Sequence, residues 1–340
     1  MADALEPTDP SSSRRAVPRV SVVIPNWNGI PHLPECLATL GIQSFRDFEV
    51  VLVDNSSTDD SVAWVRQHHP ETRVLELDEN GGFSKAVNAG IRDCQAEYVA
   101  LLNNDTAVEA DWLDALVRAL DAHPGYDFAA SKMVLYHRPE VLNAAGDVYV
   151  LARFAGKNRG IGHPAVKFEK MERVWGACAG AALYRRALFN QVGLFDEVFF
   201  LSAEDTDFNL RCLIAGKRCL YVPGAVVRHK HRATVKTLDA TTMGLMVAWN
   251  EAFVAARDLP AVVLPFLPAF WGYRVLRRTV LMRPSGWHRL PGLLRSQPSL
   301  VLAELRGMIA GGRRRPEVWK YRAAGMMALL RWLLVGSGPV

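Results

Sequence analysis

The apolar run Tyr98–Leu102 is the feature that most constrains the fold of this chain. It is followed directly by Asn103, Asn104 and Asp105, which predicts a buried strand ending in a polar turn. In open α/β sheets, ligands gather beyond the carboxyl ends of the strands, so Asp105 is a candidate metal ligand. From these residues alone, the alternative is that the turn caps the helix expected over 111–120.

Similar strand ends occur earlier in the chain. The run Val20–Ile24 stops at Pro25 and Asn26, and Phe48–Val53 stops at Asp54. Helices are expected between these strands, and a Gly-rich turn at 80–82 leads into another. This alternation predicts an α/β fold with a doubly wound, mostly parallel sheet. Neither GxxxxGK[ST] nor GxGxxG occurs, which argues against a P-loop or a dinucleotide fold.

The middle of the chain is less regular. We interpret 157–170 as a mobile loop and 174–186 as a small-residue strand region, and we expect a short strand over 218–223, followed by the segment 226–231. Between them, the acidic residues Glu204, Asp205 and Asp207 open a predicted helix.

Two interpretations of this acidic cluster stay open. The carboxylates can cap the helix, because its dipole favours negative charge at the N-terminus. The same dipole can keep a carboxylate ionised, as a general base requires near neutral pH.

Composition and cysteine usage describe a globular chain. Its 340 residues are 50% hydrophobic, enough to bury a sizeable core. The five cysteines form no CxxC pair and are odd in number, which argues against a disulfide framework or a zinc cluster. A reducing, cytosolic setting is therefore expected.

Positive charge is concentrated in the last 100 residues. They carry 14 Lys or Arg against 4 Asp or Glu, a net charge of +10, which leaves −5 for residues 1–240. Together with the apolar stretches of this region, the charge favours a membrane surface as partner rather than a nucleic acid, for which no motif is present.

No stretch has the roughly 20 uninterrupted apolar residues of a spanning helix. The closest, 259–272 and 323–336, are short and contain prolines or Arg331. We interpret residues 1–18, which lack the apolar core of a signal peptide, as a flexible leader.

Taken in order, these segments resemble the inverting nucleotide-sugar glycosyltransferases of family 2, which have the GT-A fold, and especially their rhamnosyltransferase-like branch. The resemblance covers about residues 20–234. The matching pieces are Val22–Asn28, Val53–Asp59, Asn80–Phe83, Asn88–Ile91, Leu102–Thr106, Gly193–Glu197, Glu204–Asp207 and His229.

The resemblance implies a role for each of these pieces. Asp54 would bind the nucleobase, and Asp205 would be the catalytic base. Further donor contacts would come from Pro25, Asn26, Asn80, Asn88 and Asn104. The acceptor side would be lined by Trp175, Gly176, Glu204 and Asp207. Mg²⁺ or Mn²⁺ would be held by Asn103, Asp105 and His229. Asn103 replaces an aspartate of the family motif, and its neutral amide is a weaker ligand for a hard cation.

The expected organisation is a leader (1–18), a GT-A catalytic domain (19–238) and a helical, basic C-terminal region (239–340). The expected activity is inverting sugar transfer from a nucleoside diphosphate sugar, such as dTDP-rhamnose or a UDP-sugar, to a glycan or lipid-linked glycan for cell-surface polysaccharide assembly. The protein would act at the cytoplasmic membrane surface. The alternatives are a non-catalytic membrane-associated scaffold, a nucleotidyltransferase and, for the C-terminal helices, packing on the catalytic domain.

Overall fold

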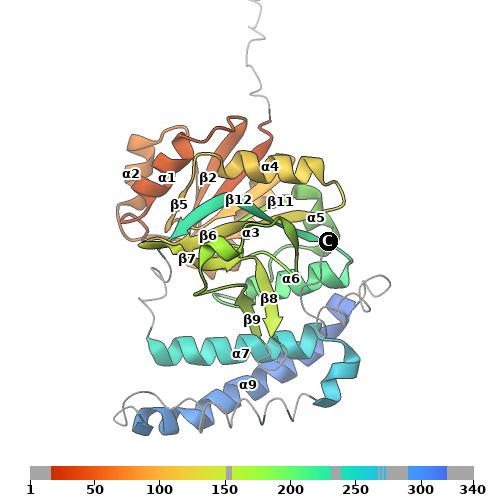
Figure 1. The fold of residues 1–340 in the computed structure, drawn as a ribbon. Helices are drawn as coiled ribbons and strands as arrows, with labels where there is room; N and C mark the ends of the chain where they lie inside the picture. Colours follow the sequence, from red (N-terminus) through yellow and green to blue (C-terminus); the bar gives the residue numbers. More distant parts are fainter. Residues whose placement is uncertain are drawn as a thin grey trace, which may run out of the picture.

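The predicted apolar runs form the core of one large sheet in the computed structural model (Figure 1). The structure describes residues 17–150, 155–230, 239–266, 269, 272 and 290–319. Strands β3, β2, β1 and β4 are adjacent and parallel, so their carboxyl ends lie at one edge of the sheet.

The sheet and its hairpin are formed by β1 (Val20–Asn26), β2 (Phe48–Asp54), β3 (Arg73–Glu76), β4 (Tyr98–Leu102), β5 (Thr106–Val108), β6 (Phe128–Leu135), β7 (Arg138–Ala145), β8 (Asp147–Val150), β9 (Ala155–Asn158), β10 (Glu172–Val174), β11 (Ala181–Arg185) and β12 (Cys219–His229). The helices are α1 (Leu33–Gly41), α2 (Ser61–His68), α3 (Gly82–Asp93), α4 (Trp112–Ala122), α5 (Arg186–Val192), α6 (Glu204–Ile214), α7 (Ala240–Asp258) and α9 (Leu290–Trp319), with 3₁₀ turns at Ala165–Lys167 and Ala261–Phe266.

Antiparallel strands extend the parallel part of the sheet. β11 lies between β4 and β6 and is antiparallel to both, and β12 continues the sheet parallel to β6. The strand predicted over 218–223 is present and continues to His229. β12 is one strand with a register shift between Val222 and Val226, because Pro223 and Gly224 interrupt the pairing without ending it.

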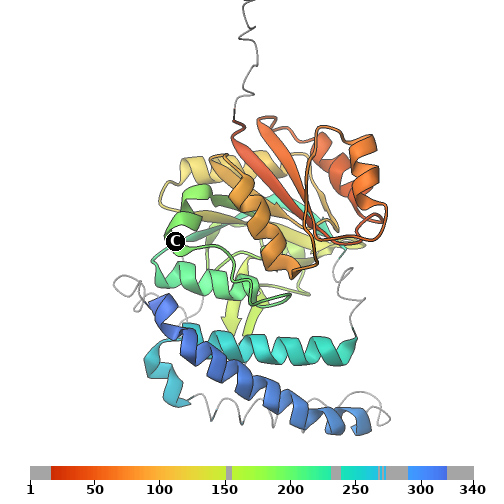
Figure 2. The same ribbon diagram turned by 180° about the vertical axis from the view of Figure 1, so that it is seen from behind.

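Two hydrophobic layers confirm the doubly wound arrangement. Neighbouring residues of β1 point to opposite faces, with Val22 packed in the layer of α1 and α4 and Val23 in the layer of α3 and α6. Figures 1 and 2 show these helices on the two faces of the sheet. The parallel strands are therefore apolar on both sides.

The segment interpreted as a mobile loop is tied to the sheet. Its first residues belong to β9, which forms a two-stranded hairpin with β8. Farther along, the Gly162 N–H donates to the Leu142 carbonyl, and the Leu142 N–H donates to the His163 carbonyl. The loop therefore follows β7, and the β8–β9 hairpin projects away from the main sheet (Figure 1).

The C-terminal helices α7 and α9 pack against each other below the sheet (Figures 1 and 2). Asp239 begins α7 by accepting hydrogen bonds from the backbone N–H groups of Thr241 and Thr242, both at 2.9 Å. Phe253 and Val254 of α7 share a core with Leu210 and Ile214 of α6. This part of the C-terminal region therefore packs on the α/β domain.

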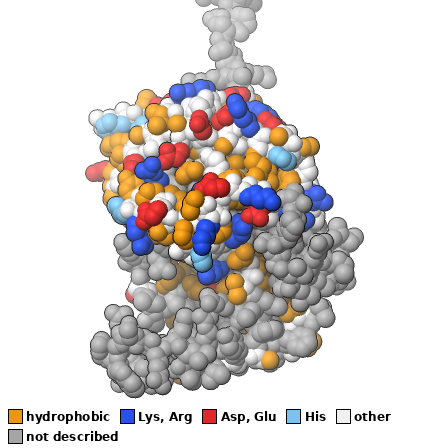
Figure 3. All heavy atoms as spheres, in the orientation of Figure 1, with side chains coloured by type: hydrophobic (Ala, Val, Ile, Leu, Met, Phe, Trp, Pro, Cys, Tyr) orange, Lys and Arg blue, Asp and Glu red, His pale blue; other side chains and the backbone are white. Residues whose placement is uncertain are grey.

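Within the described ranges, none of the helices is both long and apolar enough to cross a membrane. The predicted leader up to residue 16 and the apolar stretch 323–336 lie outside the described residues, as do Arg274, Arg277 and Arg278. On the face of the α/β domain seen in Figure 3, acidic and basic side chains are interspersed.

Candidate active site

Three polar side chains are joined at the carboxyl ends of β1, β2 and β4. Asn26 and Asp54 lie opposite each other in the parallel register. The Asn26 Nδ2 donates to Asp54 Oδ1 over 2.9 Å, and the Asn104 Nδ2 donates to Asn26 Oδ1 over 2.8 Å. A Cβ atom at Gly29 would lie 2.0 Å from Asn26 and 2.2 Å from Asn104, so this turn requires glycine. The polar ends of these three strands therefore lie side by side.

Asp54 holds the loop that follows β2. Its carboxylate accepts the Ser57 hydroxyl at 2.6 Å and the Ser57 N–H at 2.8 Å. Helix α2 begins later, at Ser61, with Asp60 as its N-cap residue. Asp54 therefore does not cap that helix. The turn after β4 does not cap one either, because β5 separates it from α4.

The remaining predicted donor residues are placed differently. Pro25 lies in β1, beyond Val23, the last residue of β1 that pairs with β4, so its missing N–H costs no bond to that strand. Asn80 accepts the Gly82 N–H at 3.0 Å and so shapes the turn into α3. Asn88 is buried, donates to the Phe195 carbonyl at 2.8 Å and accepts the Phe195 N–H at 3.1 Å. These two bonds engage the Asn88 amide with the Phe195 backbone rather than with Asn26, Asp54 or Asn104.

Asp105 and His229 come together because β5 pairs with the end of β12. The His229 Nε2 lies 3.1 Å from Asp105 Oδ1, and its Nδ1 lies 2.9 Å from the Asn143 side-chain oxygen. With Asn143 accepting from Nδ1–H, a neutral ring directs its Nε2 lone pair at the carboxylate. Two electron-pair donors this close require a proton or a cation between them.

This donor set fits a divalent cation that also binds a substrate. An imidazole nitrogen and a carboxylate oxygen are ordinary ligands of Mn²⁺, whereas Mg²⁺ prefers oxygen. In the part of the chain that the structure describes, no group of three or more His, Cys, Asp or Glu side chains could hold a metal alone. Asn103 lies two residues before Asp105 and is partly exposed. The protein can therefore supply part of a coordination shell.

The segment 176–180 forms hydrogen bonds both to the end of β4 and to helix α6. The Asn103 N–H donates to the Gly180 carbonyl at 2.9 Å. At the other end of the segment, the Gly176 carbonyl accepts the Asp147 N–H at 2.8 Å, and Asn209 of α6 bonds to both backbone groups of Ala177. A Cβ atom at Gly176 would lie 2.2 Å from the Asn209 side chain, so Gly176 allows this close approach of strand and helix.

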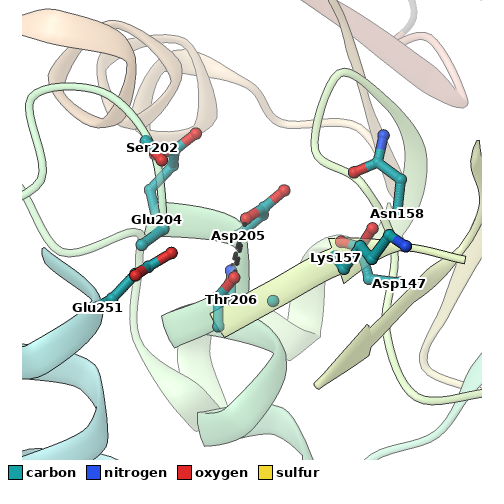
Figure 4. Close-up of a pocket in the computed structure, with 10 residues that line it drawn as sticks. Asp147, Lys157, Asn158, Ser202, Glu204, Asp205, Thr206 and Glu251 are labelled. Atoms are coloured by element: carbon teal, nitrogen blue, oxygen red, sulfur yellow. Dashed lines mark hydrogen bonds between the residues drawn. The ribbon is translucent and has the colours of Figure 1, made fainter. Parts of the chain in front are cut away.

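A pocket of about 190 Å³ opens at the N-terminus of α6. Figure 4 shows three elements around it: the start of α6, the β8–β9 hairpin and helix α7. The lining residues are Asp147, Gly156, Lys157, Asn158, Ser202, Ala203, Glu204, Asp205, Thr206 and Glu251. Gly156 packs directly on α6, because a Cβ there would lie 2.0 Å from the Thr206 hydroxyl.

Burial dominates the electrostatics of this pocket. It raises the pKa of Glu204 to about 8, with the Asp205 charge adding to the shift. Burial also raises the pKa of Asp205 and, together with the charges of Asp205 and Glu204, holds the pKa of Asp147 well above its usual range. This desolvation opposes the helix dipole, which favours the ionised form of Asp205.

Asp205 is nevertheless the carboxylate of the three best suited to carry the negative charge. It is partly exposed, and its Oδ1 accepts the Thr206 N–H at 2.6 Å. The Glu204 Oε2 and the Asp147 Oδ1 are buried and have no hydrogen-bond partner among the described residues. Since an ionised carboxylate needs donors or water, protons are retained by these two first.

Three predicted acceptor-side residues, Trp175, Gly176 and Asp207, do not line the pocket. Asp207 is fully buried and pairs with Arg211 at 2.8 Å and with Arg257. Its predicted acceptor contact was wrong, because both carboxylate oxygens serve these ion pairs. Trp175 is also buried and stacks on Tyr149, with ring centroids 5.9 Å apart.

The sequence analysis missed Asp147, Asn143 and Glu251. Asp147 could have been predicted, because it follows a glycine after an apolar run and so resembles the other carboxylates at strand ends. In the structure, Gly146 has a φ of +77° and forms the turn after β7. Asn143 lies inside β7, and Glu251 lies on a helix 46 residues after Asp205. No local pattern marks these two.

Comparison with known proteins identifies the family. The model of glycosyl transferase family 2 matches residues 21–193. This chain belongs to glycosyl transferase family 2. An N-acetylglucosaminyl-diphospho-decaprenol L-rhamnosyltransferase of Mycobacterium tuberculosis is 32% identical over 241 residues, which cover 62% of this chain and 76% of the relative.

Solved structures agree with this family 2 glycosyltransferase in fold. GalNAc-T7, solved with UDP, GalNAc and Mn²⁺, superposes with a TM-score of 0.60 at 14% identity and covers 84% of this chain and 55% of its own. TarS 1–349 of S. aureus, solved with UDP-GlcNAc, has a TM-score of 0.55 at 18% identity, with 89% and 91% covered. The predicted GT-A fold with C-terminal helices is thereby confirmed.

Proposed function

We propose that this family 2 glycosyltransferase transfers a sugar from a nucleoside diphosphate sugar to a hydroxyl group of a glycan or lipid-linked glycan, with inversion at the anomeric carbon, in cell-surface polysaccharide assembly. The observation that carries the proposal is the pocket in which Asp205 is the carboxylate best suited to ionise, connected through the segment 176–180 to the polar strand ends. The rhamnosyltransferase relative favours rhamnose as the sugar and a lipid diphosphate as the carrier of the acceptor.

Asp205 is the proposed base. Its carboxylate removes the proton from the acceptor hydroxyl as that oxygen attacks the anomeric carbon, and the nucleoside diphosphate leaves from the opposite face. The raised pKa makes Asp205 a stronger base once it is ionised, which brings it closer to the basicity that the proton transfer needs. A single displacement requires no enzyme nucleophile.

The donor side is assigned to the strand ends. Asp54, fixed by Asn26 and Ser57, would bind the imide edge of uracil or thymine, since among the described residues one of its carboxylate oxygens accepts only the Ser57 N–H. Asp105, His229 and Asn103 would hold Mg²⁺ or Mn²⁺, and the metal would neutralise charge on the diphosphate. The Asn143 side chain fixes the His229 ring for this role.

The outer face of α9 is proposed to lie on an anionic membrane. Leu302, Leu305 and Ile309 are 47%, 40% and 58% exposed and repeat at helical spacing. Arg306 and Arg313 are exposed on the same face. Such a stripe suits the lipid interface, where each nearby basic residue contributes about 1 kcal/mol. This placement at the cytoplasmic face would bring the pocket to a lipid-linked acceptor.

Donor and acceptor assays test the proposal. The purified full-length chain is incubated with dTDP-rhamnose, UDP-GlcNAc or GDP-mannose and a short-chain N-acetylglucosaminyl diphospholipid, with Mn²⁺ or with chelator, and the product anomer is determined. The expected result is an inverted glycoside from a dTDP- or UDP-sugar. Donor binding without turnover across an extended panel would favour the scaffold, and pyrophosphate release from a nucleoside triphosphate would favour a nucleotidyltransferase.

A further inference from the structure

The segment 196–203, which we call the base loop, delivers Glu204 and Asp205 to the pocket. Its last two residues, Ser202 and Ala203, have φ values of +74° and +70°, in the left-handed region that non-glycine residues avoid. Ala203 is also the N-cap residue of α6, with no side-chain hydrogen bond to stabilise the helix start. Contacts from outside the loop must therefore hold this conformation.

One face of α7 provides such contacts at three points. The Arg257 guanidinium pairs with Asp196 at the start of the loop, and the Phe253 ring meets the Phe199 ring edge to face at a centroid distance of 5.5 Å. At the end of the loop, the Asn250 Nδ2 donates to the Leu201 carbonyl at 3.0 Å and to the Ser202 carbonyl at 2.7 Å.

The three α7 residues follow helical spacing. Positions 250, 253 and 257 differ by three and four residues, so they share one face of the helix. Asn250 is almost fully buried, which makes its amide a specific partner for the loop rather than a solvated surface group. The adjacent Glu251 lines the pocket itself, beside Glu204 in Figure 4.

The base loop also reaches the donor side. The Phe200 carbonyl accepts the Phe83 N–H at 2.8 Å, and a Cβ at Gly82 would lie 2.2 Å from the Phe200 oxygen. The Gly81–Gly82 turn is in turn held by Asn55, the residue after Asp54. A displacement of the loop would therefore change the position of Asp205 relative to the donor residues.

We propose that Asn250 is a positioning residue: it fixes the strained end of the base loop, so that α7 of the C-terminal region is part of the active site. The inference rests on Asp205 being the base, as proposed above. Arg257 anchors the start of the loop and Phe253 its middle, and Asn250 is the one of the three whose contacts lie nearest to Asp205 in sequence. Removal of its two donated bonds should misplace the base while the nucleotide site, built on β1 and β2, remains intact.

The test compares Asn250→Asp with Ala248→Gly in the full-length chain. The aspartate is nearly isosteric but directs a carboxylate at two carbonyl oxygens. Ala248 is a buried residue of the same helix and belongs neither to the pocket lining nor to the hydrogen bonds between α7 and the base loop, so the glycine lowers helix stability and leaves those bonds in place. Asn250→Ser, which retains a shorter hydroxyl donor, serves if the aspartate variant does not fold.

The measurements are kcat, KM for dTDP-rhamnose, the acid limb of the kcat–pH profile, the Kd of dTDP and the melting temperature. For Asn250→Asp we expect kcat to fall about 10- to 100-fold, because displacement of a catalytic group by about 1 Å can cost 10²-fold. The acid limb should shift, and the Kd of dTDP should stay within threefold. Ala248→Gly should have a lower melting temperature than wild type, while its kcat and the acid limb of its pH profile stay close to the wild-type values.

Asp205→Asn in the same series separates the two possible failures. If Asp205→Asn retains transfer, Asp205 is not the base, and the positioning role of Asn250 is overturned together with it. If Asp205→Asn is inactive but the folded Asn250 variants match Ala248→Gly in kcat and in pH profile, the positioning role of Asn250 alone is overturned. UDP replaces dTDP, and UDP-GlcNAc replaces dTDP-rhamnose, if the donor panel selects them.

Discussion

The His229 Nε2 lies 3.1 Å from Asp105 Oδ1, although 124 residues separate the two in sequence. Asn143 fixes the other ring nitrogen of His229, at 2.9 Å. His229, which taken alone resembles a surface residue, thus lies next to Asp105, the carboxylate predicted from the strand end. It makes the metal hypothesis specific enough to test with the nucleotide alone.

Substitution of Asp105 should abolish metal-dependent nucleotide binding. Asp105→Ala removes the only carboxylate in the predicted metal set, and calorimetry with dTDP in Mn²⁺ and in chelator measures the loss. Asn103→Asp should be tolerated and should strengthen Mn²⁺ dependence, since it adds charge. Equal dTDP affinity of wild type in Mn²⁺ and in chelator would remove the metal role.

Replacement of Asn143 should weaken Mn²⁺ binding indirectly. Asn143→Leu leaves His229 and Asp105 in place but removes the acceptor for Nδ1–H, and loss of such an outer contact typically costs about 10- to 100-fold in metal affinity. The Mn²⁺ concentration that half-saturates dTDP binding reports this effect. An unchanged half-saturation in a variant with wild-type melting temperature would contradict the role of Asn143.

Asp205→Asn should retain donor binding and lose transfer. The amide is nearly isosteric but cannot accept the acceptor proton, and removal of a general base typically costs about 10²- to 10⁴-fold in rate. The kcat at saturating substrates and the Kd of dTDP are the measurements. Transfer within a few fold of wild type would exclude Asp205 as the base.

Asp54 should confer selectivity for the base of the nucleotide. Its carboxylate can accept the imide N–H of uracil or thymine, so UDP and dTDP should displace a bound donor more effectively than GDP. In Asp54→Ala, the affinities for UDP and dTDP should fall toward that of GDP. A competition titration in which GDP matches dTDP on the wild-type chain would show that Asp54 only holds its own loop.

Glu204 should make the folded chain less stable as pH rises. Its pKa is about 8 when folded, against an ordinary 4.5, so between these values the folded state binds a proton that the unfolded state releases. The free energy of unfolding then falls with pH, by at most about 1.4 kcal/mol per unit for one proton. The advantage of Glu204→Gln in melting temperature should grow from pH 5 to pH 8. A constant difference would contradict the shift.

The outer face of α9 should bind anionic vesicles. In Leu302→Ser/Leu305→Ser/Ile309→Ser, co-sedimentation with phosphatidylglycerol vesicles at low salt should decrease, while kcat on a water-soluble acceptor analogue stays unchanged. Val166→Ser, at a 74% exposed valine on a turn of the catalytic domain, is the matched control. Point substitutions are preferred to truncation at Leu238, because α7 packs on α6. If wild type stays in the supernatant, α9 has no membrane role.

Several arginines of the C-terminal region stabilise the fold through ion pairs and hydrogen bonds. Arg314 pairs with Asp196 at 3.0 Å, and Arg315 donates to the Ala256 carbonyl at 3.0 Å. Arg257 is buried among Asp196, Asp207 and Asp258. The packing alternative considered from the sequence is thus supported for α7 and for one side of α9.

The sequence by itself determined the parallel half of the sheet and the polar ends of its strands. Short apolar runs with polar ends are local patterns. The positions of Asn26, Asp54 and Asp105 at the ends of such runs can therefore be found without knowledge of the tertiary structure. The acidic cluster at the start of α6 was equally local. Its pKa shifts were not, because desolvation depends on the hairpin and the helix that cover it.

Only the tertiary structure decided which of these residues share a site and which support it. Asp207 and Asp205 are two residues apart, yet the helix turns one into a buried ion pair with Arg257 and the other toward the pocket. Asp147, Asn143 and Asn250 gained their positions from strand register and helix packing between distant segments. Such contacts leave no periodic trace in the sequence, because burial, register and ion pairing are set by the partner surface.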